Sequence, residues 1–348
     1  MRILHVSDCY PPRLGGIETQ VASLVAEQRK AGHDVRVLTL TAGPKDADII
    51  RLNAIFQRSL LLRPLSTRDI IAAYKDFKPD VVHTHVGSGA WLGWAAVRAG
   101  KKLNIPTVLT IHSIWGRIAR AVYGFRLQPR EKFRWVAVSE SAKQSIHANS
   151  NGNVIANGLS VSQWKSIETR SDRLTFITAS RFVRRKRLVQ LIEMFERLAH
   201  KHPHADFQLR IAGDGPQRQT MLKMIQSQHV VVLGRLSREE LHSEFSKAHA
   251  YIQLSRLEAF GLAAAEAQAS GLGVIGLQVS GISDFVQHNF DGFLGQSDTD
   301  IEQFLDATLE NPEKLLTYSK NVNVESKPYQ WTKVLAMYEA LYQDVIGR

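Results

Sequence analysis

The sequence has a single cysteine, Cys9, among its 348 residues, and it has no run of about 18 uncharged apolar residues. One cysteine excludes an intrachain disulfide and fits a reducing compartment. The absence of a long apolar run excludes a membrane-spanning helix, and the apolar run at Met1–Val6 is too short for the hydrophobic region of a signal peptide. We therefore expect a cytoplasmic protein whose first strand lies at the N-terminus.

Acidic residues are scarce in the first half of the chain. Residues 1–170 contain 24 Lys and Arg against 12 Asp and Glu, whereas residues 171–348 contain 20 against 21, and the formal net charge of the whole chain is +11. All of the excess positive charge therefore lies in the first half. This asymmetry indicates an anionic partner for that half.

Patterns that would hold a divalent metal are poorly placed. Asp46-Ala47-Asp48 lies in a loop with Gly and Pro, and Asp298-Thr299-Asp300 precedes a helix, where Asp favours the cap. His83 and His85 alternate on an expected strand and could chelate a metal, but we expect no third ligand nearby, so we interpret them as strand-end residues. We predict that the protein needs no metal and no cofactor.

The length predicts two α/β domains of roughly 170 residues each. Strand-like and helix-like runs alternate along the chain, which is typical of parallel sheets, and the pattern restarts at Leu174–Ser180. Residues 162–172 between the halves are polar and poor in strand formers, as expected of a domain boundary. We predict an N-terminal domain at 1–165, a C-terminal domain at 172–328 and a final helix at 329–348.

A strand, a glycine-rich loop and a helix open the chain. The loop Pro11–Gln20 contains Gly15 and Gly16 and precedes the helical run Val21–Lys30. Glycines there allow backbone N–H groups to approach a phosphate. A third glycine at the spacing of a dinucleotide fingerprint is missing, so the pattern indicates either phosphate binding or a plain tight turn.

A second strand, loop and helix follow at Ala250–Leu254 and Leu262–Ala269, with Gly261 suited to the transition between them. Glu258 lies in the loop, and Glu266 lies in the helix after it. Carboxylates accept hydrogen bonds from paired hydroxyls, which sugars display. The alternative is one Glu favoured by the helix dipole and one solvated Glu on the helix surface.

Charged and titratable residues also follow two other strands. Arg181 and Lys186 come after the strand Leu174–Ser180, where they can neutralise a diphosphate, whereas the further arginines within 184–187 can be surface charge. His112 ends the strand that begins at Val108, and the carboxyl ends of strands in doubly wound sheets bind ligands.

The segment 115–135 combines basic and aromatic side chains. Such a composition suits an acidic lipid surface or a nucleic acid, and the alternative is a solvated basic face with some core aromatics. Between the tryptophans at its two ends, the segment contains Arg117, Arg120, Tyr123, Phe125, Arg126, Arg130, Lys132, Phe133 and Arg134.

In their order along the chain, these motifs resemble the retaining glycosyltransferases of family 4, the glycosyl transferases of group 1. The resemblance is most specific in Glu258-Ala-Phe-Gly-Leu262, where Glu266 completes the Glu-x7-Glu spacing of the family. It extends to the Gly15-Gly16 loop and to Arg181 with Lys186.

This resemblance implies the GT-B fold, in which two Rossmann-like domains face one another across a cleft and the last helix returns to the N-terminal domain. It implies transfer of a hexosyl group from a UDP- or GDP-sugar to an acceptor hydroxyl, with retained anomeric configuration. His112, Arg181, Lys186 and Glu258 would act on the sugar and the departing diphosphate. The donor would be bound by Gly15, Gly16, Gly213, Arg235, Leu236, Phe260, Gly261, Leu262 and Glu266.

The N-terminal domain of a GT-B enzyme holds the acceptor, and here that domain carries the excess positive charge. We therefore expect a lipid-linked or membrane-bound acceptor at an anionic membrane surface, contacted through residues 115–135. A polysaccharide or other glycoconjugate, including a soluble one, is the alternative acceptor. Two alternatives stay open. An epimerase of nucleoside-diphosphate sugars has the same architecture and needs no acceptor, whereas a nucleic-acid-binding protein would show steeply salt-dependent binding of oligonucleotides. We expect no nucleic-acid partner.

Overall fold

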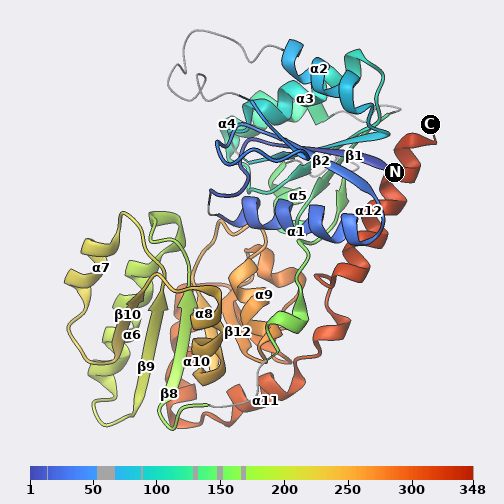
Figure 1. Cartoon of the computed structure of the whole chain (residues 1–348). Coiled ribbons are helices and arrows are strands. Elements are labelled where there is room, and N and C mark those ends of the chain that lie inside the picture. The colour runs from blue at the N-terminus through green and yellow to red at the C-terminus, as the bar shows by residue number, and fades with distance from the viewer. Residues whose placement is uncertain are drawn as a thin grey trace. The chain divides into compact units, whose positions relative to one another are not determined.

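The computed structural model describes residues 1–13, 15–52, 67–87, 89–127, 132–146, 152–165 and 170–347 (Figure 1). These residues form two compact units. The N-terminal unit comprises Met1–Gly158 and Trp331–Arg348, and the C-terminal unit comprises Leu159–Gln330. Each unit is built on one parallel sheet, as the alternation of strands and helices predicts.

The sheet of the N-terminal unit has seven strands in the order β3-β2-β1-β4-β5-β6-β7. Every neighbouring pair is parallel, and Ile3 to Ser7 of β1 lie opposite Val81 to His85 of β4. The strands are β1 (Arg2–Ser7), β2 (Asp34–Thr39), β3 (Ile49–Arg51), β4 (Val81–Val86), β5 (Thr107–Ile111), β6 (Phe133–Ala137) and β7 (Asn153–Val154).

Helices cover both faces of this sheet. Successive strand residues point to opposite faces, so Ile3 packs with α1 and α12 while Leu4 packs with α2 and α3. The last helix therefore belongs to the core of the N-terminal unit, as the family resemblance implies. The helices are α1 (Gly16–Lys30), α2 (Thr67–Phe77), α3 (Trp91–Lys102), α4 (Arg117–Tyr123), α5 (Glu140–Ile146) and α12 (Trp331–Ile346).

The C-terminal unit repeats this plan with six parallel strands in the order β10-β9-β8-β11-β12-β13. Its strands are β8 (Leu174–Ala179), β9 (Phe207–Ala212), β10 (Val230–Gly234), β11 (Ala250–Gln253), β12 (Gly273–Leu277) and β13 (Gly292–Gly295). Its helices are α6 (Leu188–Lys201), α7 (Arg218–Met224), α8 (Arg238–Lys247), α9 (Leu262–Ala269), α10 (Asp298–Glu310) and α11 (Glu313–Asn321).

Two local expectations differ from the structure. The first helix begins at Gly16 rather than Val21, because Glu18 suits the first turn of a helix, where the backbone N–H groups are unpaired. Asp298 and Asp300 lie inside the first turn of α10, and Ser297 is the cap residue, with its hydroxyl accepting from the Asp300 N–H.

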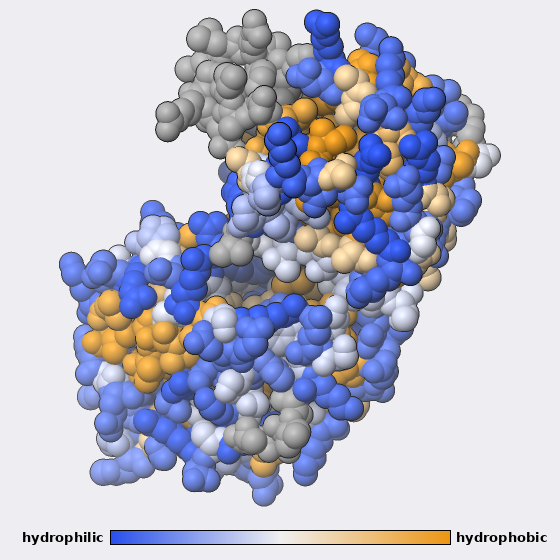
Figure 2. All heavy atoms as spheres, in the orientation of Figure 1, coloured by the Kyte–Doolittle hydropathy of each residue, from blue (hydrophilic) through white to orange (hydrophobic). Residues whose placement is uncertain are grey.

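Surface hydropathy is uneven in the C-terminal unit. Hydrophobic side chains gather over the edge strand β10 and its neighbours (Figure 2), and Leu222 of α7 is 41% exposed. Among the residues that the structure describes, no helix is both long enough and apolar enough to cross a bilayer.

A buried ion pair between Lys327 and Asp291 stabilises the last segment of the C-terminal unit. Lys327 donates to the Asp291 carboxylate and to the Phe285 carbonyl, and the Lys327 and Asp291 residues are only 5% and 1% exposed. We predict that Lys327→Met lowers the free energy of unfolding by about 3–5 kcal/mol, because it leaves a buried carboxylate without its cation.

Denaturant unfolding measures this loss. The matched control is Lys30→Met, which breaks the exposed pair with Glu27 and should cost about 0.5 kcal/mol. Equal losses in the two variants would contradict a structural role for the buried pair.

Candidate active site

The C-terminal unit brings two loops together where the strand order reverses, between β8 and β11. Ligands of open parallel sheets bind beyond the carboxyl ends of strands at such a point. The Ser255 hydroxyl, after β11, donates to the Arg185 carbonyl at 3.1 Å. The Arg187 guanidinium donates to the Leu254 carbonyl at 3.2 Å, so both loops are fixed to each other.

Lys186 and Glu258 form an ion pair between these loops. The Lys186 ammonium donates to the Glu258 carboxylate, and the two side chains are 18% and 13% exposed. The sequence indicated both residues but not their contact. A cation and a carboxylate thus lie side by side, and either charge is available to a ligand that replaces its partner.

A second ion pair supports the first loop. Arg187 has a left-handed backbone, with φ of 56°, and its guanidinium is bidentate to Asp298 at the start of α10. This contact raises the pKa of Arg187 and lowers the pKa of Asp298. The interpretation as surface charge is therefore wrong for Arg187, whereas Arg184 and Arg185 are exposed. Arg181, which we assign to the phosphate, is also exposed.

Glu266 lies on α9, one helical turn beyond Leu262. Burial raises the pKa of Glu266 to about 7, and the nearby Arg238 lowers it in part. The carboxyl group of Glu266 therefore titrates near neutral pH.

Gly261 precedes the helix with φ of +94°, a conformation that L side chains rarely adopt. The Gly261 carbonyl accepts from the Ala265 N–H at 3.0 Å.

Gly213 joins the ends of three strands in the same unit. Its N–H donates to the Gly234 carbonyl at 2.7 Å, and a Cβ atom built on it would lie 1.9 Å from the Ser180 carbonyl oxygen. Only glycine fits this close approach of the Gly213 backbone to the Ser180 backbone.

Arg235 and Leu236 follow β10 directly. Arg235 is exposed, and Leu236 is partly buried.

In the N-terminal unit, a carboxylate lies against the glycine loop. A Cβ atom built on Gly15 would lie 2.3 Å from the Glu18 Oε2 atom, and Glu18 is buried and pairs with Arg13 at 3.0 Å. Gly16 is the first residue of α1. The sequence motif did not indicate this internal carboxylate beside the proposed phosphate-binding N–H groups.

His112 follows β5 and belongs to a row of histidines. Its Nε2 atom is 3.0 Å from His85 Nδ1, and His85 Nε2 is 2.8 Å from His5 Nδ1. Burial lowers the pKa of His112 and of His5 to about 4. These side chains are therefore neutral at pH 7.

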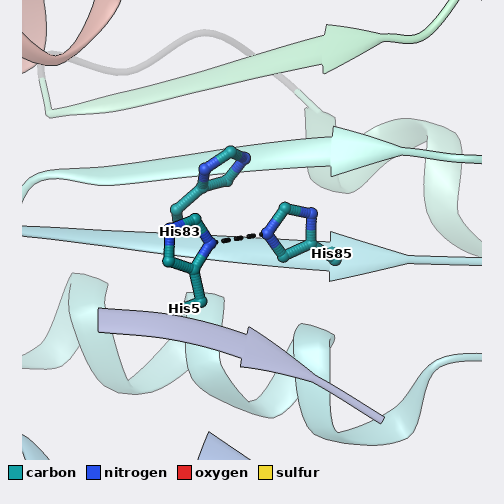
Figure 3. Close-up of side chains that lie close together, drawn as sticks. All are labelled: His5, His83 and His85. Atoms are coloured by element: carbon teal, nitrogen blue, oxygen red, sulfur yellow. Dashed lines mark hydrogen bonds between the residues drawn. The ribbon is translucent and has the colours of Figure 1, made fainter. Parts of the chain in front are cut away.

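His83 and His85 lie within β4 rather than at its end, and His5 of β1 is beside them (Figure 3). The expectation that no third histidine is near them is therefore wrong, because His5 lies opposite His83 in the parallel register. One ring nitrogen from each residue lies within 4.8 Å of the others. A histidine in the middle of the apolar first strand was the sequence signal for this cluster.

The two halves of the chain match two family models. Residues 14–163 match Glycosyltransferase Family 4, and residues 162–323 match Glycosyl transferases group 1. The chain belongs to glycosyltransferase family 4. With its two parallel sheets, this glycosyltransferase has the GT-B fold.

Relatives of the glycosyltransferase span its whole length. The alpha-monoglucosyldiacylglycerol synthase of Acholeplasma laidlawii is 25% identical, covering 100% of this chain and 98% of that protein. The gpi3 subunit of the phosphatidylinositol N-acetylglucosaminyltransferase of Schizosaccharomyces pombe is 24% identical, covering 98% and 80%. The solved structure of Anabaena HepE with UDP and glucose is similar in fold, with a TM-score of 0.76, 17% identity and coverage of 98% and 99%.

The segment 115–135 of the glycosyltransferase divides into two parts. Phe133 and Trp135 are buried in β6, and Arg134 pairs with Asp344 of α12 at 3.0 Å, so this part is core. In α4, by contrast, Ile118 is 82% and Val122 44% exposed. Residues 128–131, with Arg130, lie outside the described residues, as do the side chains of Tyr123, Phe125 and Arg126.

A substitution tests the close contact between Gly213 and the Ser180 carbonyl. We predict that Gly213→Ala lowers the free energy of unfolding by about 2–4 kcal/mol, because the new methyl group collides with the Ser180 carbonyl and φ is +129°. The control Gly271→Ala also has a positive φ but open space around it, and should cost about 1–2 kcal/mol. Denaturant unfolding of both variants decides whether the collision matters beyond φ.

Proposed function

We propose that the glycosyltransferase moves a hexosyl group from a UDP- or GDP-sugar to a hydroxyl of a lipid-linked, polysaccharide or other glycoconjugate acceptor, with retention and without a metal. The observation that carries this proposal is the Lys186–Glu258 pair at the point where the strand order reverses. A nucleoside-diphosphate sugar presents an anion and paired hydroxyls in adjacent groups, which match these two side chains.

In the proposed mechanism, Arg181 and Lys186 stabilise the diphosphate as its negative charge develops. When the Lys186 ammonium turns to the phosphate, the Glu258 carboxylate becomes available to hydroxyls of the sugar. Binding of the donor thus replaces the Lys186–Glu258 contact by two others, one between Lys186 and the phosphate and one between Glu258 and the sugar hydroxyls. The Glu258 carboxylate therefore has hydrogen-bond donors both before and after binding.

The nucleoside is held by the neighbouring elements of the C-terminal unit. Ionised Glu266 accepts hydrogen bonds from the ribose hydroxyls, and the residues at the start of α9 contribute backbone groups. Gly213 leaves room for the nucleotide beside the residues that follow β10. The remaining residues assigned to the nucleotide are Arg235, Leu236, Phe260, Gly261 and Leu262.

The N-terminal unit contributes neutral groups to the same donor. His112 contacts the sugar, and Gly15 and Gly16 offer backbone N–H groups to the diphosphate while Arg13 neutralises Glu18. The acceptor oxygen bonds to the anomeric carbon on the face from which the diphosphate departs. The bond from that carbon to the phosphate oxygen breaks, and the departing phosphate takes the acceptor proton, so no protein nucleophile is needed.

A lipid-linked acceptor is supported by two observations. The two relatives described above are, by name, a monoglucosyldiacylglycerol synthase and a subunit of a phosphatidylinositol N-acetylglucosaminyltransferase. In α4, exposed Ile118 and Val122 lie one turn apart beside exposed Arg117. Apolar side chains flanked by cations are typical of helices that lie on an anionic bilayer.

The first test is the donor and its phosphate site. A thermal-shift panel of UDP, GDP, ADP and dTDP sugars should reveal one base, because a ligand at 100 times its dissociation constant adds about 2.7 kcal/mol of stability. With that donor, Arg181→Met and Lys186→Met should each lower turnover about 100- to 1,000-fold. Arg184→Met removes an exposed neighbouring charge and is the control. Wild-type turnover in both test variants would refute this phosphate site.

Glu266 makes nucleotide binding depend on pH. Because its pKa is about 7 and ribose hydroxyls donate to the ionised form, the carboxyl group must lose its proton on binding. We predict that the affinity for UDP or GDP falls as the pH drops from 8 to 6, by up to about tenfold per unit well below the pKa. The affinity of Glu266→Gln should lack this part of the pH dependence. The affinity of both proteins is measured by calorimetry, and their comparison removes the contribution from titration of the diphosphate itself. Parallel pH profiles would contradict the assignment.

The surface of α4 gives the third test. Sedimentation with anionic vesicles at low salt should fall strongly for the double variant Ile118→Ser/Val122→Ser, and by about fivefold for Arg117→Gln, since each cation near the surface contributes about 1 kcal/mol. Leu222→Ser, an exposed apolar position in the C-terminal unit, is the control. Wild-type protein that binds neither anionic nor neutral vesicles would overturn the membrane proposal and leave the glycosyl transfer untouched.

A further inference from the structure

A continuous row of hydrogen bonds runs through the N-terminal unit from α12 to His112. Tyr342 Oη is 3.0 Å from Gln28 Nε2, and Gln28 Oε1 is 2.6 Å from His5 Nε2. His5 Nδ1 is 2.8 Å from His85 Nε2, and His85 Nδ1 is 3.0 Å from His112 Nε2. Gln28, His5 and Tyr342 are fully buried or nearly so.

The orientation of the Gln28 amide, whose Nε2 atom donates to Tyr342, sets where each proton of the row lies. The Gln28 carbonyl oxygen can only accept, so His5 Nε2 carries the hydrogen. A neutral imidazole has one N–H, so His5 Nδ1 accepts from His85 Nε2, and His85 Nδ1 in turn accepts from His112 Nε2. His112 Nδ1 is then left without a hydrogen.

Burial keeps the row neutral, as this logic requires. It lowers the pKa of His5 and His112 to about 4 and the pKa of His85 well below its ordinary value. The positive charge of Arg29 lowers the pKa of His5 further. At pH 7 the protons can move only by exchange of tautomers.

Tyr342 orients the Gln28 amide. Its hydroxyl accepts from Gln28 Nε2 and lies 2.7 Å from His83 Nδ1, and His83 Nε2 lies 2.7 Å from the Thr110 hydroxyl. With this amide orientation, the Tyr342 proton is free for His83 Nδ1, which leaves the His83 hydrogen on Nε2 to donate to Thr110. A reversed amide would require every hydrogen in both branches to reverse together. All six ring nitrogens of His5, His83 and His85 have hydrogen-bond partners, which favours this network over a metal site.

We propose that Gln28 is a positioning residue that acts through His5 and His85 to hold His112 as the Nε2–H tautomer, with Nδ1 ready to accept a hydrogen bond from a hydroxyl of the donor sugar. The inference rests on the proposed function, because it takes His112 to contact the sugar. Tyr342 on the last helix is the anchor of the row.

The test is nitrogen-15 NMR of histidine-labelled protein without ligand, with the His112 signals assigned from His112→Gln. Wild-type protein should show protonated Nε2 and unprotonated Nδ1 at His112. Gln28→Met and Tyr342→Phe should each shift His112 towards a mixture of tautomers. Tyr74→Phe is the matched control, because it removes one buried hydroxyl from the same unit, and that hydroxyl donates to the Ala96 carbonyl rather than to any member of the row.

A protonated Nδ1 at His112 in the wild type, or identical His112 spectra in all variants, would overturn the inference. Because the spectra need no donor, this outcome is independent of the proposed glycosyl transfer. Binding supplies the functional half of the test, with UDP-glucose against UDP or GDP-mannose against GDP as the thermal-shift panel directs. The preference for the sugar nucleotide should fall about three- to tenfold in Gln28→Met and stay unchanged in Tyr74→Phe.

Discussion

The ion pair of Lys186 and Glu258 is the contact on which the C-terminal site depends. Each side chain is mostly buried, and a buried charge is stable only with a partner. The fold supplies that partner by joining the loops after β8 and β11, with Arg187 and Ser255 as the ties between them. A ligand that enters must therefore offer both an anion and hydroxyls, because either alone would leave one buried charge unsatisfied. In the function that we propose, this constraint gives the site its selectivity for a sugar bound to a phosphate.

In the N-terminal unit, buried polar side chains find their partners in neutral groups rather than in ion pairs. Its histidines hydrogen-bond to side chains of α1 and α12, and burial holds their pKa values below the neutral range. Neutral imidazoles still donate and accept, so a row of them satisfies its own polar atoms and ends in one acceptor. The excess positive charge of this half is consequently a property of its surface, not of its buried polar row.

The sequence alone predicted the parallel alternation, most strand positions and the α9 helix, because these follow from local apolar patterns and turn residues. It also indicated Lys186 and Glu258, in the loops after two strands, and Glu266 in the helix that follows the second loop. The missing parts are contacts between distant segments. His5 and His85 are 80 residues apart, and Arg187 and Asp298 are 111 apart, so no local spacing reports them. Glu18 was missed because its carboxylate turns back on Gly15.

The last helix has a consequence for how the N-terminal site forms. The C-terminal unit occupies the sequence between β7 and α12, yet Val334, Tyr338 and Tyr342 belong to the core around β1 and β4. Without α12 that face of the sheet would expose apolar side chains, and Gln28 would lose the hydroxyl that orients its amide. Residues near the end of the chain therefore complete both the core and the polar row of the first unit. In the inference drawn above, the tautomer of His112 is therefore fixed only after α12 has packed against the sheet.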